Sequence, residues 1–508
     1  MCKPAVFVLL LAFLAFGCSS SERQAEIDIG DGVVVGRLLP NGVEAYLGIP
    51  YAEPPVGHRR WKPPTEMSFP TSEKMVAAEF GPACPQDQGN PEWYRTIAEH
   101  FGSSPSVVSD LTDISEDCLF LNIWTPADRK PGPLPVMVWI HGGSNVNGWA
   151  HEPNYLGHHL AARGVVVVSL NYRLGPLGFL AHPTINGGGE TQRATNVGLL
   201  DQIAALSWIS EHVHLFGGDP QNVTVFGESA GGADIYALMR SPLAEGLFHR
   251  AAIQSGALAK PAIVGREDAE QAGRALLAQY TDEDLSVLQE IPWQDLIENR
   301  SKLIPDYYFA PIFDSKELPS KISTRRIPLL IGVNRDEWFM YLPDDSDGLL
   351  AESLEQYTSG HLTQVETYLS AEQRGVKHKT NLLLSAAEFL CPAIEIAKAN
   401  AESGAPTYVY FFTRERPGAE GLHAYHGAEI PYVFGTSDAW LPQSNQDEAL
   451  SDAMMTYWLN FARYGDPNSD QSPTWPKFSS DQRRMLELGR SIEVLSSNPA
   501  AVCEYLDG

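Results

Sequence analysis

Short apolar runs alternate along the chain with stretches whose apolar residues recur at helical spacing. The segments 136–140 and 165–171 are almost continuously apolar, which is typical of strands covered on both faces of a sheet. In 196–212, apolar residues instead recur every three or four positions, which predicts a helix with a buried face. Alternation of the two patterns predicts an α/β fold, in which helices flank a mostly parallel central sheet.

The same patterns place the remaining elements. The segments 33–37 and 43–47 flank Pro40-Asn41-Gly42 and predict a small N-terminal β-hairpin. The stretch 257–327 lacks a strong period, and we expect it to form helical cap insertions over an active-site mouth. Further strands are predicted at 119–124, 223–226, 251–254, 329–333 and 407–412, and further helices at 231–239 and 449–464.

Residues 1–17 have the features of a signal peptide. Lys3 precedes a mostly apolar, uncharged run over 4–16, which is shorter than the roughly 20 residues of a membrane span. Ala-Phe-Gly-Cys at 15–18 resembles a bacterial lipobox, which favours lipidation of Cys18 as the mature N-terminus; ordinary cleavage before Cys18 is the alternative. We therefore expect an exported protein, membrane-anchored and facing the periplasm or cell exterior, or else soluble, with a short tether over 18–28.

Four further cysteines follow Cys18: Cys84, Cys118, Cys391 and Cys503. An even number in an exported protein predicts two disulfides, for which three connectivities exist. Order along the chain favours Cys84–Cys118 and Cys391–Cys503. No Cys-x-x-Cys or nearby histidine pair accompanies them, so a zinc site is not indicated.

Composition excludes two classes of protein. The chain has 63 Asp and Glu against 36 Lys and Arg, a net charge of −27, which argues against a nucleic-acid partner. With 44% hydrophobic and 19% charged residues, it is also too apolar to be a disordered chain. The acidity favours solubility and does not identify a substrate.

A glycine-rich turn between a predicted strand and a predicted helix carries the candidate nucleophile. Residues 223–232 read Val-Thr-Val-Phe-Gly-Glu-Ser-Ala-Gly-Gly, so a Gly-x-Ser-x-Gly motif places Ser229 at the turn. A nucleophile in such a turn has a strained backbone, and side chains at the glycine positions would collide with the neighbouring chain. The helix that follows directs backbone N–H groups toward developing negative charge.

A second turn lies about ninety residues earlier, where the strand at 136–140 ends in His-Gly-Gly-Ser. We expect the backbone N–H groups of Gly143 and Ser144 to form an oxyanion hole together with that of Ala230. A tight turn that merely requires positive φ would use the same residues.

These motifs resemble those of the type B carboxylesterase family, which includes the cholinesterases and the non-catalytic neuroligins. Gly-Ile-Pro-Tyr-Ala-Glu-Pro-Pro-Val-Gly at 48–57 resembles its N-terminal segment, Ser-Glu-Asp-Cys-Leu-Phe-Leu-Asn-Ile-Trp at 115–124 its second signature, and Gly-Glu-Ser-Ala-Gly-Gly at 227–232 its serine signature. The resemblance spans nearly the whole mature chain. It implies an α/β-hydrolase fold in one domain over 29–508, in a member of the bacterial lipoprotein type.

The resemblance also implies a catalytic triad. The family's acid lies in Gly-x-Asn-x-Asp-Glu, here Gly-Val-Asn-Arg-Asp-Glu, which gives Glu337. Its histidine precedes Gly-x-Glu-Ile, here Gly-Ala-Glu-Ile, which gives His426. The chain order Ser229, Glu337, His426 fits the hydrolase order of nucleophile, acid and base. Asp336 is the rival acid and His423 the rival base.

Supporting roles follow from the same resemblance. Ser255 resembles a serine that hydrogen-bonds the acid, and Glu228 resembles a glutamate that influences the histidine electrostatically. The family's disulfides match the two pairs favoured by chain order. Two structural ion pairs are also implied, Arg173–Asp201 and Arg60–Glu116.

The chain departs from the family pattern at three places. Ser144-Asn145 stands where a third glycine and an aromatic residue are common, which makes the oxyanion hole and acyl pocket more polar. Trp338 follows the acidic pair where glycine is usual. The loop of the family's choline-site tryptophan differs, and Trp93 and Tyr94 lie in it without an alignable counterpart.

Together these features predict a serine carboxylic ester hydrolase that acts on small-molecule esters through a Ser-His-Glu triad and an acyl-enzyme intermediate. No metal or organic cofactor is implied, and the oligomeric state is not indicated. We expect Tyr307 and Tyr308 to line the acyl pocket. One rival is a binding protein of the neuroligin sort, against which the complete triad weighs. The other is a hydrolase of lactones, amides or thioesters, which would use the same machinery.

Overall fold

The structure, a computed structural model, describes residues 24–29, 32–69, 74–128, 132–187, 195–257, 264–280, 284–313, 317–319, 324–418, 421–470 and 472–506. The expected signal peptide over 1–17 and Cys18 lie outside the described residues. Within the described ranges, none of the helices combines the length and apolar character that a membrane span requires.

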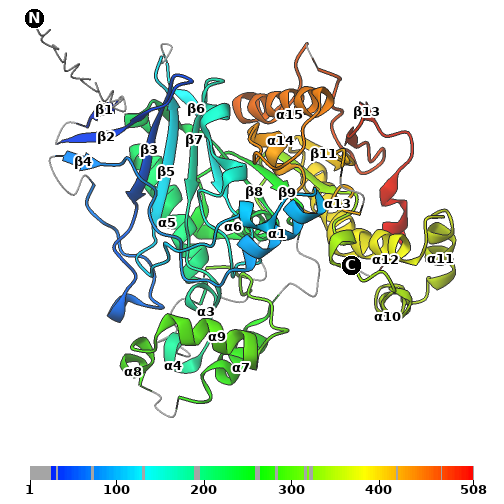
Figure 1. Cartoon of the computed structure of the whole chain (residues 1–508), viewed down its shortest axis with the longest axis horizontal. Coiled ribbons are helices and arrows are strands. Elements are labelled where there is room, and N and C mark those ends of the chain that lie inside the picture. The colour runs from blue at the N-terminus through cyan, green and yellow to red at the C-terminus, as the bar shows by residue number, and fades with distance from the viewer. Residues whose placement is uncertain are drawn as a thin grey trace, which may run out of the picture.

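A mixed sheet, with 13 strands in the described part of the chain, forms the centre of the molecule (Figure 1). Its order is β1-β2-β3-β5-β7-β6-β8-β9-β10-β11-β12-β13, and β4 pairs with β2. From β7 to β12 neighbouring strands are parallel, whereas the N-terminal strands β1, β2, β3, β5 and β7 pair in antiparallel fashion, as do β12 and β13. The strands are β1 Gln24–Asp28, β2 Val33–Leu38, β3 Val43–Pro50, β4 Lys74–Val76, β5 Phe120–Pro126, β6 Leu134–Ile140, β7 Val166–Leu170, β8 Gly218–Glu228, β9 Arg250–Gln254, β10 Leu329–Asn334, β11 Thr407–Phe412, β12 Leu486–Leu488 and β13 Ile492–Val494.

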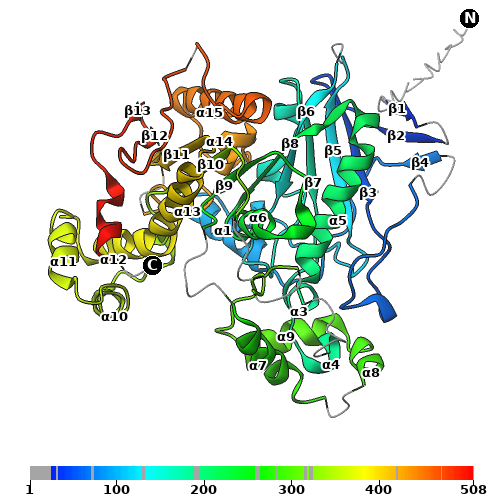
Figure 2. The same cartoon turned by 180° about the vertical axis from the view of Figure 1, so that it is seen from behind.

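Helices cover both faces of this sheet, which explains why its central strands are apolar throughout. Alternate side chains of β6 enter different core layers: Val136, Val138 and Ile140 pack in one, and Met137 and Trp139 in the other. Figure 2 shows α5, α6 and α13 in front of the sheet, on the first layer, while α14 and α15 contribute to the second. This arrangement is the predicted α/β fold.

The longer connections between strands contain the helices. They are α1 Gly89–His100, α2 His158–Ala161, α3 Gly175–Gly178, α4 Pro183–Asn186, α5 Val197–His212, α6 Ala230–Arg240, α7 Arg266–Leu277, α8 Leu285–Gln289, α9 Trp293–Leu303, α10 Asp347–Tyr357, α11 Leu362–Ser370, α12 Val376–Ser385, α13 Cys391–Glu402, α14 Ile430–Phe434 and α15 Asn445–Tyr464. The expectation of helices in 257–327 is confirmed by α7, α8 and α9, which lie together at the lower edge of Figure 1.

Two boundaries differ from the sequence-based expectation. The expected tether over 18–28 is wrong for its second half, because residues 24–28 form β1 and alternately bury Ala25 and Ile27 against the sheet. Helix α15 begins at Asn445, four residues before the expected start. Ser444 and Asp447 form a reciprocal capping box there, which satisfies N–H groups of the first turn.

Both favoured disulfides are present, Cys84–Cys118 and Cys391–Cys503, with Cα atoms 5.0 and 5.3 Å apart. Both implied ion pairs are present as well. The buried Arg173 and Asp201 side chains meet at 2.7 Å through two N–H groups, and Nε of Arg60 lies 2.7 Å from a Glu116 carboxylate oxygen.

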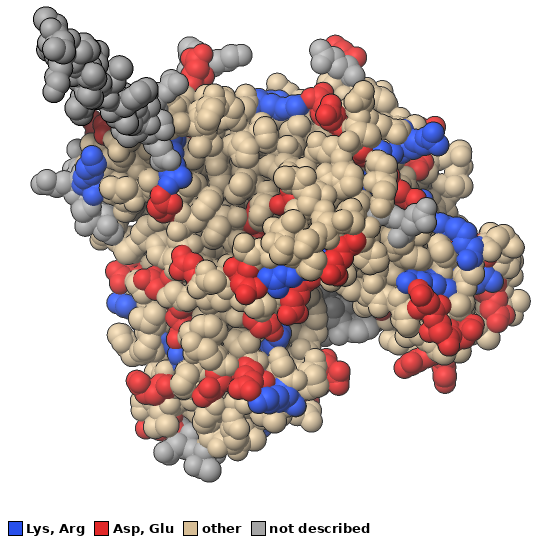
Figure 3. Space-filling model, in the orientation of Figure 1, with Lys and Arg blue, Asp and Glu red and all other residues tan. Residues whose placement is uncertain are grey.

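The acidity predicted from composition is spread over the surface. Figure 3 shows acidic side chains over the lower helices of this face and over the lobe at the right that contains α10 and α11. Helix α7 contributes Glu267, Asp268 and Glu270 to this surface. These carboxylates lie outside the set of residues that line the cavity described next.

Candidate active site

Ser229 lies in a sharp turn between β8 and α6. Its backbone has φ 54° and ψ −125°, outside the usual regions for a residue with a side chain, and Ala230 begins the helix directly after it. A Cβ atom at Gly227 would lie 2.5 Å from the carbonyl oxygen of Ile140, and one at Gly231 would overlap the same oxygen. The two glycines are therefore required because the turn packs directly on the end of β6.

The His-Gly-Gly turn after β6 lies beside this serine. Gly143, Ser144 and Ser229 line one cavity, and Gly143 and Ser144 have left-handed backbones with φ 97° and 55°. As the first residue of α6, Ala230 has an N–H group without a partner inside the helix. The structure thus brings the three predicted oxyanion donors to the residues around Ser229.

Glu337 and His426 meet across the ends of β10 and β11. Nδ1 of His426 and Oε2 of Glu337 are 2.6 Å apart, and the backbone N–H of Asn334 donates to Oε1 of Glu337 at 2.7 Å. The Glu337 carboxylate is buried and His426 lines the same cavity as Ser229. Among the described residues, the His426 ring nitrogens contact Glu337 and Glu228 and not the Ser229 hydroxyl, a contact that tightens in many enzymes only when substrate binds.

The rival acid and base belong to a separate network. Nδ1 of His423 lies 3.3 Å from Oε1 of Glu415. Asp336 accepts hydrogen bonds from Arg335 at 2.8 Å, from the Asn381 amide at 3.0 Å and from the Ala424 backbone. Because Arg335 also pairs with Glu415, this group holds the loop before His426 rather than facing the cavity.

Glu228 is the second carboxylate close to the histidine. Its Oε1 lies 3.2 Å from Nε2 of His426. Burial raises the pKa of Glu228, and the neighbouring Glu429 and Glu337 carboxylates raise it further. Burial by itself would lower the pKa of His426, but Glu228 and Glu337 outweigh it and raise that pKa. The electrostatic influence implied for Glu228 is therefore present in the geometry.

The role expected for Ser255 is wrong in this structure. In the part of the chain that the structure describes, its buried hydroxyl has no hydrogen-bond partner, so it does not bind Glu337. The backbone of Asn334 and the imidazole of His426 occupy the two carboxylate oxygens of Glu337 instead. The backbone N–H of Ser255 donates to the Gly332 carbonyl at 2.8 Å, so this residue connects the chain after β9 to β10.

The cavity beside Ser229 has aromatic walls and a volume of about 280 Å³. Helix α1 supplies Trp93 and Tyr94, and the Trp93 indole N–H donates to the Tyr341 hydroxyl at 2.8 Å. Among the described residues that line the cavity, none comes from α7, α8 or α9, so these helices do not occupy the expected position at its wall, whereas α1 does. The other lining residues include Trp139, Tyr155, Asn90, Asn147, Glu152, Val146 and Ile430.

Sequence reasoning missed Glu152 and Tyr341. Oε2 of Glu152 accepts from the Tyr94 hydroxyl at 2.7 Å and Oε1 from the Asn90 amide at 2.9 Å, which fixes α1 against the cavity. Burial raises the pKa of Glu152. A sequence cue for Glu152 was available, because it follows the end of strand β6 by only twelve residues and so lies close in the chain to the oxyanion turn. Tyr341 closes a short helical turn after Trp338, whose ring packs edge-on against it.

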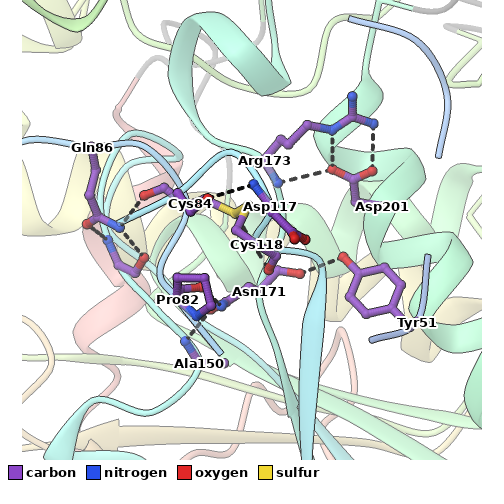
Figure 4. Close-up of a disulfide and its surroundings, with 12 residues drawn as sticks. Tyr51, Pro82, Cys84, Gln86, Asp117, Cys118, Ala150, Asn171, Arg173 and Asp201 are labelled. Atoms are coloured by element: carbon purple, nitrogen blue, oxygen red, sulfur yellow. Dashed lines mark hydrogen bonds and ion pairs between the residues drawn. A yellow bond between two sulfur atoms is a disulfide. The ribbon is translucent and has the colours of Figure 1, made fainter. Parts of the chain in front are cut away.

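The loop closed by Cys84–Cys118 supports the turn that holds the oxyanion donors. Figure 4 shows Gln86 beside this disulfide; its amide donates to the Gly148 carbonyl and accepts from the Gly148 N–H, both at 2.8 Å. Asn171 donates to the Pro82 carbonyl at 2.9 Å and accepts from the Ala150 N–H at 2.7 Å (Figure 4). Gln86 thereby connects the disulfide loop to the chain just after the turn, and Asn171 connects that chain to Pro82, just before Cys84.

A serine at a strand-to-helix turn, a histidine–carboxylate pair and two candidate oxyanion segments at the carboxyl edge of the parallel strands define a protein of the α/β-hydrolase class. Residues 23–505 match the model of the carboxylesterase family, and the chain belongs to that family. The protein is a carboxylic ester hydrolase. Such an enzyme acts on small ester substrates.

Known relatives agree with this assignment over nearly the full length. The para-nitrobenzyl esterase of Bacillus subtilis (strain 168) is 36% identical over 482 residues, which cover 89% of this chain and 93% of that protein. A solved PNB esterase structure superimposes with a TM-score of 0.78 at 33% identity, covering 92% of this chain and 96% of the other. A thermophilic PNB esterase gives the same TM-score and identity, with 92% and 97% covered.

Proposed function

We propose that the protein hydrolyses small carboxylic esters through Ser229 as nucleophile, His426 as general base and acid, and Glu337 as the group that orients the imidazole. The observation that supports this most directly is the 2.6 Å contact between Glu337 and His426 at a cavity that Ser229 also lines. The strained backbone of Ser229, at the start of α6, is what a nucleophile at such a turn requires.

In the proposed reaction, Ser229 Oγ attacks the ester carbonyl while Nε2 of His426 takes the hydroxyl proton. The negative oxygen of the tetrahedral intermediate is stabilised by the N–H groups of Gly143, Ser144 and Ala230. The intermediate collapses, the alcohol leaves with the proton from His426, and an acyl-enzyme remains. Water, deprotonated by His426, attacks the acyl carbon and releases the acid. Glu337 stabilises the imidazolium formed in each half-reaction.

We further propose that esters of aromatic alcohols are preferred. The aromatic wall formed by Trp93, Tyr94, Trp139 and Tyr341 offers apolar surface and ring edges to a benzyl or phenyl group. A relative named for para-nitrobenzyl esters supports the same substrate class. The test is a screen of benzyl acetate and para-nitrobenzyl acetate against ethyl and hexyl acetate, all esters of poorly activated alcohols, with kcat/KM expected to be higher for the aromatic pair.

Export is proposed as well, with Cys18 acylated as a membrane anchor. The apolar run over 4–16, the Ala-Phe-Gly-Cys sequence and the two disulfides support it, because disulfides persist in oxidising compartments. Mass spectrometry of the mature N-terminus tests the anchor. A diacylglycerol-modified Cys18 is expected. An unmodified N-terminal Cys18 would refute the anchor and would indicate export with ordinary signal-peptide cleavage.

Replacement and labelling of Ser229 test the catalytic proposal. Purified protein is expected to hydrolyse p-nitrophenyl butyrate and to be labelled at Ser229 alone by an organophosphate, and Ser229→Ala should lose at least about 10⁴-fold in kcat. Ser207→Ala, which removes a hydroxyl bonded only to the Ile203 carbonyl within α5, is the matched control and should remain active. Full turnover by Ser229→Ala would refute the mechanism.

The same assays separate the rival functions. A binding protein of the neuroligin sort would show neither turnover nor organophosphate labelling. A lactone, amide or thioester hydrolase would be labelled at Ser229 but would turn over those substrates faster than p-nitrophenyl butyrate.

A further inference from the structure

The turn that carries the proposed oxyanion donors contains two consecutive non-glycine residues in the left-handed region. Ser144 has φ 55° and Asn145 has φ 56°, directly after Gly143. Each such residue costs about 1–2 kcal/mol relative to an ordinary backbone conformation. Contacts outside the turn must therefore hold it. The Ser144 side chain bonds to Tyr308, and Asn145 makes three further contacts.

Asn145 is buried and bonded on three sides. Its carbonyl oxygen accepts from the Gly175 N–H at 2.6 Å, and its Oδ1 accepts from the Tyr172 hydroxyl at 3.2 Å. The same hydroxyl lies 2.8 Å from the His141 carbonyl at the start of the turn. On the third side, Nδ2 of Asn145 donates to Oδ1 of Asp234 at 3.3 Å.

Asp234 lies in α6, five residues after Ser229, and is completely buried. Its Oδ2 accepts from the Gln202 amide at 2.5 Å, and among the described residues no Lys or Arg forms an ion pair with it. Burial of a carboxyl group without a positively charged partner costs free energy, so the hydrogen bonds from Gln202 and Asn145 must offset that cost. Its two oxygens connect α5, α6 and the turn after β6.

The Asn145–Asp234 bond joins the two separate segments that supply the proposed donors. Gly143 and Ser144 belong to the turn after β6, whereas Ala230 begins α6, the helix that carries Asp234. The three N–H groups converge on one oxygen only if turn and helix keep a fixed spacing. Preorganised donors of this kind stabilise the transition state because they need not move during the reaction.

We propose that Asn145 and Asp234 are positioning residues that lock the turn after β6 to helix α6 and so align the oxyanion donors. The proposal rests on the function proposed above for Ser229 and these N–H groups. It also explains the departure at Ser144-Asn145, because an aromatic residue at 145 could not bond to Asp234. The positioning role requires both Asn145 and Asp234, because each supplies one partner of the hydrogen bond between the turn and α6.

Three variants test this pairing: Asp234→Leu, Asp234→Asn and Asn145→Gly. Leucine removes both acceptors, and glycine permits positive φ but removes the anchoring amide. In Asp234→Leu and in Asn145→Gly, we expect kcat for p-nitrophenyl acetate to fall about 10- to 100-fold. This loss is smaller than the 10²–10³-fold that is typical when a whole oxyanion donor is removed. KM should stay within about threefold of wild type, since the hydrogen bonds from the oxyanion donors to the substrate oxygen strengthen only in the transition state.

Asp234→Asn is the conservative variant and should keep kcat within about threefold of wild type. Asn retains an oxygen acceptor toward Asn145, and a rotated Gln202 amide can accept from its new N–H group because Oε1 of Gln202 has no partner among the described residues. Affinity for a trifluoromethyl ketone, which forms a tetrahedral adduct with the serine, should follow kcat/KM across all three variants.

Asn400→Ala is the control for loss of a buried amide far from the cavity. Its amide donates to the Ile327 carbonyl at 3.1 Å and to the Thr407 hydroxyl at 2.9 Å, so the variant should lower the melting temperature without changing kcat. If Asp234→Leu does not fold, Asn145→Gly provides the same comparison.

Wild-type kcat in Asn145→Gly or Asp234→Leu would overturn the positioning role, as would equal losses in Asp234→Asn and Asp234→Leu. If Ser229→Ala is inactive, such results would refute the positioning role of Asn145 and Asp234 but not the proposed function. If Ser229→Ala is active, the proposed function itself is refuted.

Discussion

Close backbone packing holds the proposed nucleophile, Ser229, whereas hydrogen bonds hold the proposed acid and base, Glu337 and His426, on the other side of the cavity. Gly227 and Gly231 bring the turn at Ser229 so close to the Ile140 carbonyl that no side chain fits between them. Across the cavity, Glu337 is held by an N–H group of Asn334 and by the His426 ring.

The acid–base side extends this bonding through further polar residues. The Asn334 amide donates to the Tyr425 carbonyl and to Glu429, both at 2.7 Å, and Glu429 also accepts from Gln254. Packing of backbone on backbone tolerates no added atom, while a hydrogen-bonded network loses one contact at a time. Mutations on the two sides should therefore fail in different ways.

The largest effect should come from removing the proposed base. His426→Ala is expected to lower kcat by about 10³- to 10⁴-fold, because Ser229 then lacks a proton acceptor and the fold keeps its packing. His423→Ala is the matched control and should stay within about threefold, since His423 faces Glu415. Steady-state assays with p-nitrophenyl butyrate measure both; the reverse ranking would make His423 the base.

On the packed side, Gly231→Ala should primarily affect stability. Its new Cβ would overlap the carbonyl oxygen of Ile140 and lie 2.6 Å from that of His141, so we expect a loss of about 3 kcal/mol in the free energy of unfolding. Gly348→Ala, at an open position in α10, should be neutral or slightly stabilising. Urea denaturation compares them, and equal stabilities would contradict the packing argument.

On the hydrogen-bonded side, Asp336→Asn should cost about 1.5–3 kcal/mol of unfolding free energy, because it weakens bonds from Arg335, Asn381 and Ala424. The folded variant should keep kcat within about threefold. Denaturation and kinetics on the same preparation test this. A loss of activity comparable with that of Glu337→Gln would identify Asp336 as the acid.

The smallest effect is electrostatic. Glu228→Gln removes a carboxyl group that raises the pKa of His426, so that pKa should fall. The base must be neutral, and the acidic limb of the kcat/KM profile should therefore move to lower pH by up to about one unit. A limb that stays in place or moves to higher pH would show that Glu228 does not act on His426.

Contiguous residues allowed much of the nucleophile side to be predicted. Gly-x-Ser-x-Gly records in five positions that a strand ends, a turn packs tightly and a helix begins, and the structure has this geometry. The strands of the parallel sheet were recognisable for a similar reason, since burial on both faces leaves an apolar run in the sequence. Both disulfide pairs also followed chain order.

The network around the turn could not be predicted in this way. Asn145 and Asp234 are 89 residues apart, and nothing in either local sequence indicates that they meet. Ser255 shows the opposite error, because a family resemblance implied a bond to Glu337 that the structure does not contain. Trp93 and Tyr94 reach the cavity only because α1 folds over it.

The sequence by itself determined the fold class and the turn at Ser229, and its family motifs predicted Glu337 and His426 as acid and base, which the structure places in contact. Only the tertiary structure decided which side chains hold them in place. The physical reason is that turns and strands are set by neighbouring residues, whereas the bonds of Asn145, Asp234 and Glu152 depend on how the sheet orders its strands and how helices pack on it.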